Sequence, residues 1–352
     1  MRYDSIRLAD FSASSAKTRR GGFDSGFFSL VMILLVIGVT MVLFDDSSIE
    51  GGCLSTSASN DAKLVCDKLG IEHHVIDLKD DFKNRVINNF VDCYKNGITP
   101  NPCVECNKYL KFGALYEYAK KIGCDYIATG HYAKAKDGKL MKSKAESKDQ
   151  SYFLYGIKKD ILDHVLFPLA DFTDKEEIRK IALENDLVVA RKKDSQEICF
   201  IPNDDYTDYL EKNLDKLPAK GDFILKDGTI LGKHKGIFYY TIGQRKGLGI
   251  SYKHPLYVIE IDYKNNKVIL GEEKDLYSNE LVINNINILV DKLPERAYAK
   301  IRYRAKESLA TIKQISENEI KVIFDEPQRS ITKGQSVVFY ENDVCLGGGI
   351  IK

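Results

Sequence analysis

Cysteine is scarce in this sequence, and so is any excess of charge of one sign. The chain has 8 cysteines in 352 residues, too few for a fold held together by disulfides. It shows no cleavable signal peptide, internal repeat or low-complexity linker, so we expect a cytoplasmic protein with reduced thiols. The formal net charge is only +1, so a polyanionic partner would have to be held by local basic patches.

One long uncharged stretch covers residues 27–44. It has 18 residues, the lower limit for a membrane-spanning helix, and it follows the basic string KTRR. The alternative is a buried helix that leads into a buried parallel strand and is interrupted at Gly38. The pattern alone leaves both interpretations open.

Helix and strand patterns alternate from residue 59 to about residue 202. This alternation predicts a parallel sheet with helical crossovers, whose ligands bind at the carboxyl ends of the strands. One expected strand ends in the string ATGHY, at Gly130 and His131. Expected helices begin with Ser59 as an N-cap, at Asp80, and at a capping box from Thr173 to Glu176, and a strand is expected over 73–78.

Short β patterns replace this alternation after about residue 205. Residues 222–234, 236–250 and 255–272 each resemble strands or hairpins, the last with its turn at Asn265 and Asn266. Strand patterns then follow one another from about residue 281 to the end, which favours a small closed β-barrel or sandwich. The string CLGGGI, residues 345–350, predicts a bulge or a close approach of strands there.

Two cysteines three residues apart, Cys103 and Cys106, form the most distinctive local motif. A structural zinc site usually needs a second such pair, which the sequence lacks, and the proline-rich lead-in is not typical of a thioredoxin-like redox pair. Cys199 follows the last α/β unit, where burial as a small apolar residue is the ordinary expectation. If it met Cys106 in space, the two could act as a nucleophile and its resolving partner, with Lys192 and Lys193 favouring a thiolate.

Glycine-rich and basic strings offer two further kinds of site. The string RGGFDS, residues 20–25, is suited to cradling a pyrophosphate with backbone N–H groups, although so short a motif is more often a turn. The string KIRYRAK, residues 300–306, places four cations around Tyr303 on an expected strand. A solvated face is the usual explanation, but with the basic loop GQRKG and the polar, aromatic string SKDQSYFLYG it also suits a folded RNA.

Together these strings resemble the bacterial tRNA-specific 2-thiouridylase family. The similarity runs from about residue 37 to the last residue, through TPNPCVECNKYLKFG, DYIATGHYA, SKDQSYFLYG, KKDSQEICFIP, KGIFYYTIGQRKGLGI, KIRYRAK and EPQRSITKGQSVVFYENDVCLGGGII. The resemblance implies an α/β domain of the PP-loop (adenine nucleotide alpha hydrolase-like) type over residues 1–205. A small central domain over 206–278 and a tRNA-binding C-terminal β-barrel over 279–352 would follow.

The resemblance also implies an activity, ATP-dependent 2-thiolation of the wobble uridine of tRNA. ATP, with Mg²⁺, would adenylate the C2 oxygen, and sulfur would then come from a cysteine persulfide. The implied partners are the tRNA anticodon stem-loop and a persulfide donor such as a cysteine desulfurase or a sulfur-relay carrier, with no stable membrane association. Cys106 would be the nucleophile, and Cys199 would carry the persulfide and form a transient disulfide with Cys106.

Other site residues are implied by the same motifs. Cys103 adds a third thiol, which makes an iron–sulfur cluster on Cys103, Cys106 and Cys199 conceivable. The expected ATP-binding residues are Gly21, Gly22, Asp24, Ser25, Met41 and Gly130. The expected contacts to the target base or the tRNA are Asn101, Pro102, Cys103, His131, Lys148, Asp149, Gln150, Arg302, Tyr303 and Gln335.

The sequence departs from the family pattern over residues 1–36. Arg20 stands where the family loop has a serine, and the residues before it are too polar for a central strand. We therefore keep an alternative, a catalytically impaired or membrane-tethered tRNA-binding relic with weakened ATP binding. Another PP-loop enzyme, such as an amidating ligase, would share the first domain but would have no need of Cys106 and Cys199.

Overall fold

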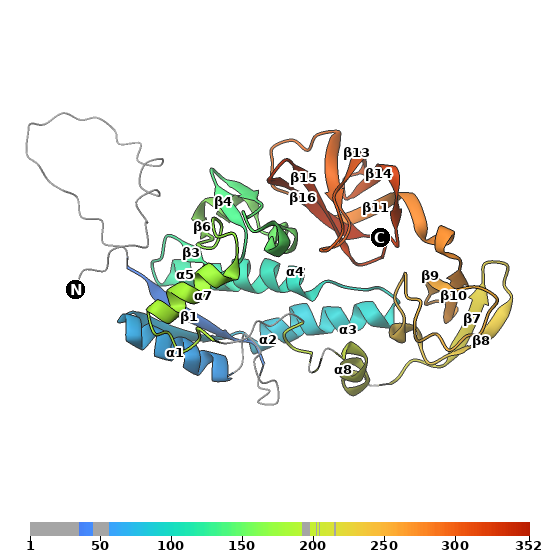
Figure 1. Ribbon diagram of the computed structural model, residues 1–352, viewed down its shortest axis with the longest axis horizontal. Helices are drawn as coiled ribbons and strands as arrows, with labels where there is room; N and C mark the ends of the chain where they lie inside the picture. Colours follow the sequence, from blue (N-terminus) through green and yellow to red (C-terminus); the bar gives the residue numbers. More distant parts are fainter. Residues whose placement is uncertain (1–34, 45–55, 192–197, 202, 204, 215) are drawn as a thin grey trace, which may run out of the picture. The chain divides into compact units, whose positions relative to one another are not determined.

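The computed structural model describes residues 35–44, 56–191, 198–201, 203, 205–214 and 216–352 (Figure 1). Residues 37–352 group together by their contacts, separately from residues 1–36, and the account below concerns the described residues of this larger unit.

Two parallel strand pairs form the sheet structure of the first domain. Strand β1 (Ile37–Val42) pairs with β2 (Glu72–Asp77), and helix α1 (Thr56–Leu69) connects them. Strand β3 (Ile127–Ala128) pairs with β6 (Val165–Leu166). The end of the uncharged stretch is thus a strand, and no helix among the described residues is long and apolar enough to cross a membrane.

Two helical runs lie along each other beside these strands, at α3 and α4 in Figure 1. Their inward side chains, which include Phe82, Phe90 and Leu110, are almost completely buried in one apolar cluster. The first run is the predicted helix, which starts at Lys79. Its parts are α2 (Lys79–Phe82), a π-helical turn (Lys83–Ile87) and α3 (Asn88–Lys95), and the second run is α4 (Pro102–Cys106), a π-helical segment (Asn107–Ala114) and α5 (Leu115–Lys121).

Two predicted helix starts are displaced in the structure. Ser59 lies inside α1 rather than at its N-cap. Helix α7 (Lys175–Glu184) is capped by Asp174, whose side chain accepts from the Glu177 backbone N–H at 3.1 Å, so the N-cap is one residue later than predicted. The other elements of the domain are β4 (Lys134–Lys136), β5 (Lys139–Met141), α6 (Ser151–Leu154), α8 (Tyr206–Asn213) and 3₁₀ turns at Glu146–Lys148 and Lys159–His164.

A four-stranded sheet in the order β8-β7-β10-β9 forms the central domain. The β9–β10 hairpin turns at Asn265 and Asn266, as predicted. Residues 236–250 were expected to be extended, but they form a 3₁₀ turn (Ile237–Tyr239) and a loop because Gly243 and Gly247 adopt positive φ angles. The strands are β7 (Gly221–Leu225), β8 (Ile230–His234), β9 (Tyr257–Asp262) and β10 (Lys267–Gly271), and a 3₁₀ turn (Glu273–Leu276) follows.

Six antiparallel strands close into a barrel at the C-terminus, in the order β11-β14-β13-β12-β15-β16, with β16 pairing back to β11. Gly347 lies at a bulge, where an added Cβ would be 2.2 Å from the Asn287 backbone oxygen, so the predicted close approach is confirmed. The strands are β11 (Tyr277–Ile288), β12 (Arg296–Lys300), β13 (Ser308–Ser316), β14 (Glu319–Arg329), β15 (Ser336–Glu341) and β16 (Val344–Ile351).

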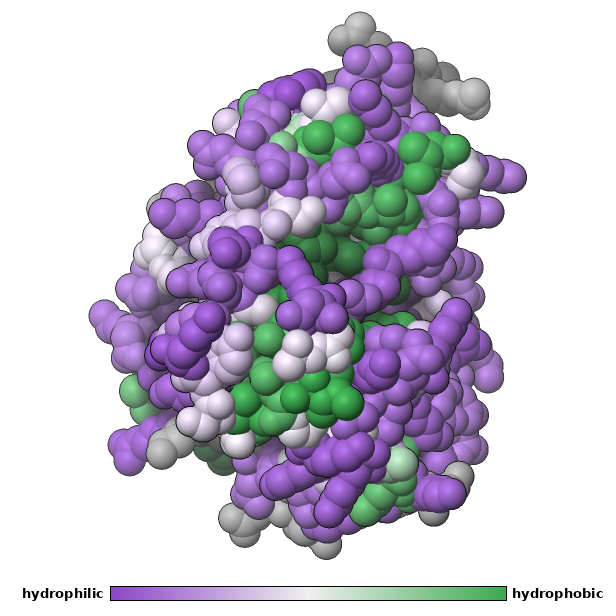
Figure 2. All heavy atoms as spheres, turned by 90° about the vertical axis from the view of Figure 1, so that its right-hand side faces the viewer, coloured by the Kyte–Doolittle hydropathy of each residue, from purple (hydrophilic) through white to green (hydrophobic). Residues whose placement is uncertain are grey.

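The barrel and the first domain are joined by backbone pairing. Met141 of β5 pairs with Val344 of β16, so the β4–β5 hairpin extends the barrel sheet. Figure 2 shows the side of the molecule that is on the right in Figure 1. Most of that face is hydrophilic, and hydrophobic residues gather in patches, one of which reaches into a hollow.

Candidate functional site

Cys106 is the last residue of α4, a short helix that starts at Pro102 after the N-cap residue Asn101. Proline fixes a helical φ angle and has no N–H, so the first position of a helix suits it. The Cys106 side chain is only 7% exposed, and burial raises its pKa to about 11. The thiol is therefore protonated at neutral pH, and it needs a nearby cation or a bound ligand to act as a nucleophile.

Cys199 lies in the same apolar cluster as Cys106, although the two are far apart in the sequence. Cys106 belongs to the buried part of this cluster with Phe90 and Phe200, and the partly buried Cys199 packs against it. Neither cysteine is in a disulfide. The fold thus places both cysteines that the sequence singled out in one apolar cluster, while their chemical roles stay predictions.

Cys103 is exposed, in contrast to Cys106. The described residues include all three cysteines of the conceivable iron–sulfur site, yet no group of three or more His, Cys, Asp or Glu side chains among them is arranged to hold a metal ion. The expectation of a cluster is therefore not supported by this arrangement of side chains.

A lysine that is close to Cys106 in the sequence and the fold lies in contact with a histidine. The Nζ atom of Lys111 lies 3.4 Å from Nε2 of His131. Because an ammonium only donates, His131 must accept at Nε2 and carry its proton on Nδ1, from which it donates to Thr129 Oγ1 at 2.8 Å. Burial, followed by the Lys111 charge, lowers the His131 pKa to about 3, so the ring is neutral. Lys111 also acts to lower the pKa of Cys106, against the larger effect of burial.

Lys111 was missed by reasoning from single residues. The only signal was its place in the string CNKYLKFG, five residues after Cys106. The cations that the sequence suggested for this task, Lys192 and Lys193, lie outside the described residues. Lys111 instead follows Cys106 in the π-helical segment, where i→i+5 bonding changes which side chains share a face.

The expected nucleotide-binding residues fall into two groups. Met41 is buried in β1, and Gly130 follows β3 at the carboxyl end of the strand, as predicted. An added Cβ at Gly130 would meet only Leu169, at 3.9 Å, so a ligand can approach the backbone closely here. The remaining expected residues, Gly21, Gly22, Asp24 and Ser25, lie outside the described residues.

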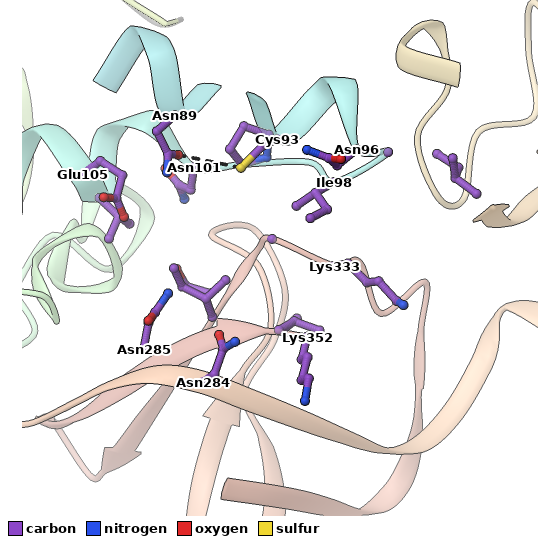
Figure 3. Close-up of a pocket in the computed structure, with 18 of the residues that line it drawn as sticks. Asn89, Cys93, Asn96, Ile98, Asn101, Glu105, Asn284, Asn285, Lys333 and Lys352 are labelled. Atoms are coloured by element: carbon purple, nitrogen blue, oxygen red, sulfur yellow. Dashed lines mark hydrogen bonds between the residues drawn. The ribbon is translucent and has the colours of Figure 1, made fainter. Parts of the chain in front are cut away.

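Residues expected around the target base point to different sides of α4. Asn101 lines a cavity of about 380 Å³ together with Val104 and Glu105 (Figure 3). Val104, which lines the cavity, is two helical residues before Cys106, a rotation of about 200°, so Cys106 lies on another face of the helix. Pro102 is buried, which leaves Cys103 as the exposed member of the three.

Two of the three residues expected at 148–150 have internal partners. The buried Asp149 carboxylate accepts from Ser143 N at 3.0 Å and from Ser151 Oγ at 2.6 Å. The Gln150 side-chain oxygen accepts from the backbone N–H of residue 132 at 3.0 Å. Lys148 is exposed, and we infer that the other two hold its turn in place.

The expected tRNA contacts of the barrel do not lie on a strand. Strand β12 ends at Lys300, so Arg302 and Tyr303 are in the turn that follows, contrary to the prediction. The Tyr303 ring packs against Phe153 with ring centroids 4.4 Å apart. Arg302 donates to the Ser330 backbone oxygen and to Thr332 Oγ1, and these acceptors draw its guanidinium out of the strand direction.

Comparison with known proteins decides the family. Profiles described as the tRNA methyl transferase HUP domain, the tRNA methyl transferase PRC-barrel domain and the aminomethyltransferase beta-barrel domain match residues 20–203, 207–272 and 278–351. The tRNA-specific 2-thiouridylase MnmA of Clostridioides difficile (strain 630) is 48% identical over 350 residues, covering 94% of this chain and 96% of that protein. The MnmA proteins of Acetivibrio thermocellus and Clostridium acetobutylicum are 47% and 48% identical, each with 94% of this chain and 97% of their own length covered.

The chain belongs to the tRNA-specific 2-thiouridylase family. The fold class implied by the sequence, a nucleotide-binding α/β domain, a small central domain and a C-terminal β-barrel, is confirmed by the three matched domains of this family. The match of the first domain begins at residue 20, so it includes the glycine-rich string that contains Gly21 and Ser25. Cys106 and Cys199 come from separate parts of that domain and lie in one apolar cluster.

Proposed function

We propose that this chain thiolates the wobble uridine of tRNA at C2, in a reaction that consumes ATP with Mg²⁺. The observation that carries the proposal is the presence of Cys106 and Cys199 in one apolar cluster of an ATP-using family's first domain. Relatives named tRNA-specific 2-thiouridylase match almost the whole chain and support the same reaction. We also propose the domain limits 1–205, 206–278 and 279–352, and a cytoplasmic place of action.

The first step activates a poor leaving group. The C2 oxygen of the uracil attacks the α-phosphate of ATP and pyrophosphate departs, so the oxygen later leaves as AMP. Gly130 would let the nucleotide approach the end of β3, and Met41 would contact it from β1. The uridine must leave its stack in the anticodon loop, which costs about a few kcal/mol.

The second step transfers sulfur from a persulfide on Cys199, which a cysteine desulfurase or a sulfur carrier would supply. The terminal sulfur attacks C2 and AMP leaves, which gives a disulfide-linked adduct. The Cys106 thiolate then attacks the Cys199 sulfur, the S–S bond to the transferred sulfur breaks, and that sulfur stays on C2. A disulfide between Cys106 and Cys199 forms, and an external thiol reduces it before the next turnover.

Lys111 supports this chemistry because its ammonium acts to lower the pKa of Cys106. The proposal routes no step through an iron–sulfur cluster, which would require Cys103, Cys106 and Cys199 to rearrange into a ligand set. If such a cluster formed, anaerobically purified protein would be brown and would contain iron.

Thiouridine in tRNA tests the proposal. In a strain that lacks its own enzyme, the wild-type chain should restore 2-thiouridine, as measured by mass spectrometry of digested tRNA. Cys199→Ala should abolish it, and Cys124→Ala, a partly buried cysteine of another cluster, should not. Normal 2-thiouridine with Cys199→Ala, or none with the wild-type chain, would refute the proposal.

A further inference from the structure

A turn of the barrel presses against the loop that precedes the Cys106 helix. Residues 333–335, between β14 and β15, lie against residues 98–100. Thr99 N–H donates to the Lys333 backbone oxygen at 3.0 Å. The Gln335 side-chain amide donates to the Thr99 and Pro100 backbone oxygens at 3.0 and 3.2 Å. Three hydrogen bonds thus join two domains directly in front of α4.

Backbone hydrogen bonds within the barrel hold Gln335, the donor, in place. Its backbone N–H donates to the Thr332 oxygen at 3.2 Å, and its own oxygen accepts from Ile351 N–H at 2.9 Å. On the other side, Pro100 is buried and has no N–H to offer the loop. A buried backbone oxygen needs a hydrogen-bond donor. The side-chain amide of Gln335 donates to two consecutive backbone oxygens, those of Thr99 and Pro100.

Gly334 allows the two segments to come this close. Its φ angle is +89°, and an added Cβ would lie 2.3 Å from Ile98 Cγ2 and 2.7 Å from the Thr99 oxygen. Real Cβ atoms do not approach other atoms so closely, so any side chain here would push the loop away.

The cavity of Figure 3 lies beside this junction. Its walls come from α3, the loop and α4, at Cys93, Ile98 and Glu105, from the barrel, and from Ile261 and Tyr263 of the central domain. The cavity of about 380 Å³ leaves part of the space between α4 and the barrel unfilled, while Val104 of α4 packs in one apolar cluster with Val338 of β15. The contact with the 333–335 turn supports the loop immediately before the start of the helix.

A displacement at this support would reach Cys106. Asn101 directly follows the bonded loop, and Cys106 is five residues later, at about 7.5 Å along a helix. Arg302, one of the expected tRNA contacts, holds Thr332 Oγ1 at 2.6 Å, and Thr332 in turn accepts from Gln335. Arg302 is thus bonded to the turn that contacts the loop before the helix.

We propose that Gln335 and Gly334 position the Cys106 helix from the barrel, so that the barrel sets where the Cys106 thiol meets the adduct between Cys199 and the target base. The proposal rests on the thiolation proposed above. It gives Gln335, which the resemblance marks as a tRNA contact, a positioning role for the reaction.

Gln335→Glu tests the proposal with the least change of shape, since a carboxylate cannot donate to the two carbonyls. Gln335→Ala removes the donors without adding charge. Gln314→Glu is the matched control, because Gln314 is an exposed barrel residue whose amide bonds only nearby backbone oxygens of its own turn. The measurements are tRNA affinity, the single-turnover thiolation rate at saturating tRNA, and hydrogen exchange of residues 98–106.

Both Gln335 variants should thiolate about 10–100-fold more slowly at saturating tRNA, as expected for a misplaced reacting group. Their tRNA affinity should equal that of the control, and residues 98–106 should exchange faster. Weakened tRNA affinity with an unchanged thiolation rate would overturn the proposal and favour a direct tRNA contact. Unchanged hydrogen exchange of residues 98–106 would also overturn it. Hydrogen exchange needs no activity, so faster exchange in a chain that does not thiolate would support the junction while the proposed function failed.

Discussion

The Gly334→Ala variant gives the sharpest stability test of the contact between the 333–335 turn of the barrel and the 98–100 loop before α4. The new Cβ would lie 2.3 Å from Ile98 Cγ2 and 2.7 Å from the Thr99 oxygen, at a φ angle of +89°. The left-handed backbone conformation costs a non-glycine residue about 1–2 kcal/mol. Forcing an extra methyl group into a filled site costs about 1–3 kcal/mol more. We therefore expect the free energy of unfolding to fall by about 2–5 kcal/mol.

Gly228→Ala separates the two contributions. Gly228 has a φ angle of +88°, and nothing lies within 4 Å of an added Cβ. This variant should lose only the backbone contribution of about 1–2 kcal/mol. Chemical denaturation of both variants, followed by far-ultraviolet circular dichroism, measures the difference.

The cavity beside Ile98 offers the loop a place to move. If the loop shifts, part of the steric strain is relieved. The free energy of unfolding then falls less, but Cys106 is displaced. Gly334→Ala should then lose more thiolation activity than Gly228→Ala at a temperature where both variants are folded. Equal stability and equal activity of the two variants would refute the reasoning.

Three further outcomes follow from burial and hydrogen bonding. Desolvation raises the pKa of both thiols, that of Cys106 to about 11, but Cys103 is exposed and Cys106 is buried, so access decides the order and iodoacetamide at pH 8 should modify Cys103 first; the order is read by mass spectrometry, and faster modification of Cys106 would contradict it. The His131 pKa is lowered to about 3, so the folded state loses stability as the pH falls below the unfolded value of about 6.5; between pH 7 and 5 this loss is about 2 kcal/mol, and it should be absent in His131→Gln. Asn287 donates to two carbonyls of the first domain at 2.6 and 2.8 Å, so Asn287→Asp should lower the free energy of unfolding by about 2–4 kcal/mol, whereas Asn285→Asp at an exposed position should not.

Local pattern was enough to predict the long elements. The helix that was expected to begin at Asp80 and the strand expected over 73–78 both exist, because their apolar residues recur with the spacing of one buried face. The pattern failed after Lys300, where alternation continues in the sequence but the chain turns. The Ser330 backbone oxygen and the Thr332 hydroxyl accept hydrogen bonds from Arg302 and draw it away, and no local signal encodes these acceptors.

The candidate site was predictable in its residues but not in its contacts. Resemblance singled out Cys106 and Cys199, and the fold places them in one cluster. The Lys111–His131 contact and the bonds from Gln335 to the 98–100 loop join residues far apart in the chain. Such contacts depend on how whole domains pack, and the spacing of residues along a sequence does not define that packing.

The central claim is that the Cys106 and Cys199 thiols come together during the reaction. Mild oxidation of the purified chain, digestion without reduction and mass spectrometry of the linked peptides measure this directly, because a disulfide forms only between cysteines whose Cα atoms come within about 7 Å. The account predicts a Cys106–Cys199 linked peptide as the main product, lost in Cys199→Ala. A main product that links Cys103 to Cys106, or Cys199 to any other cysteine, would contradict it.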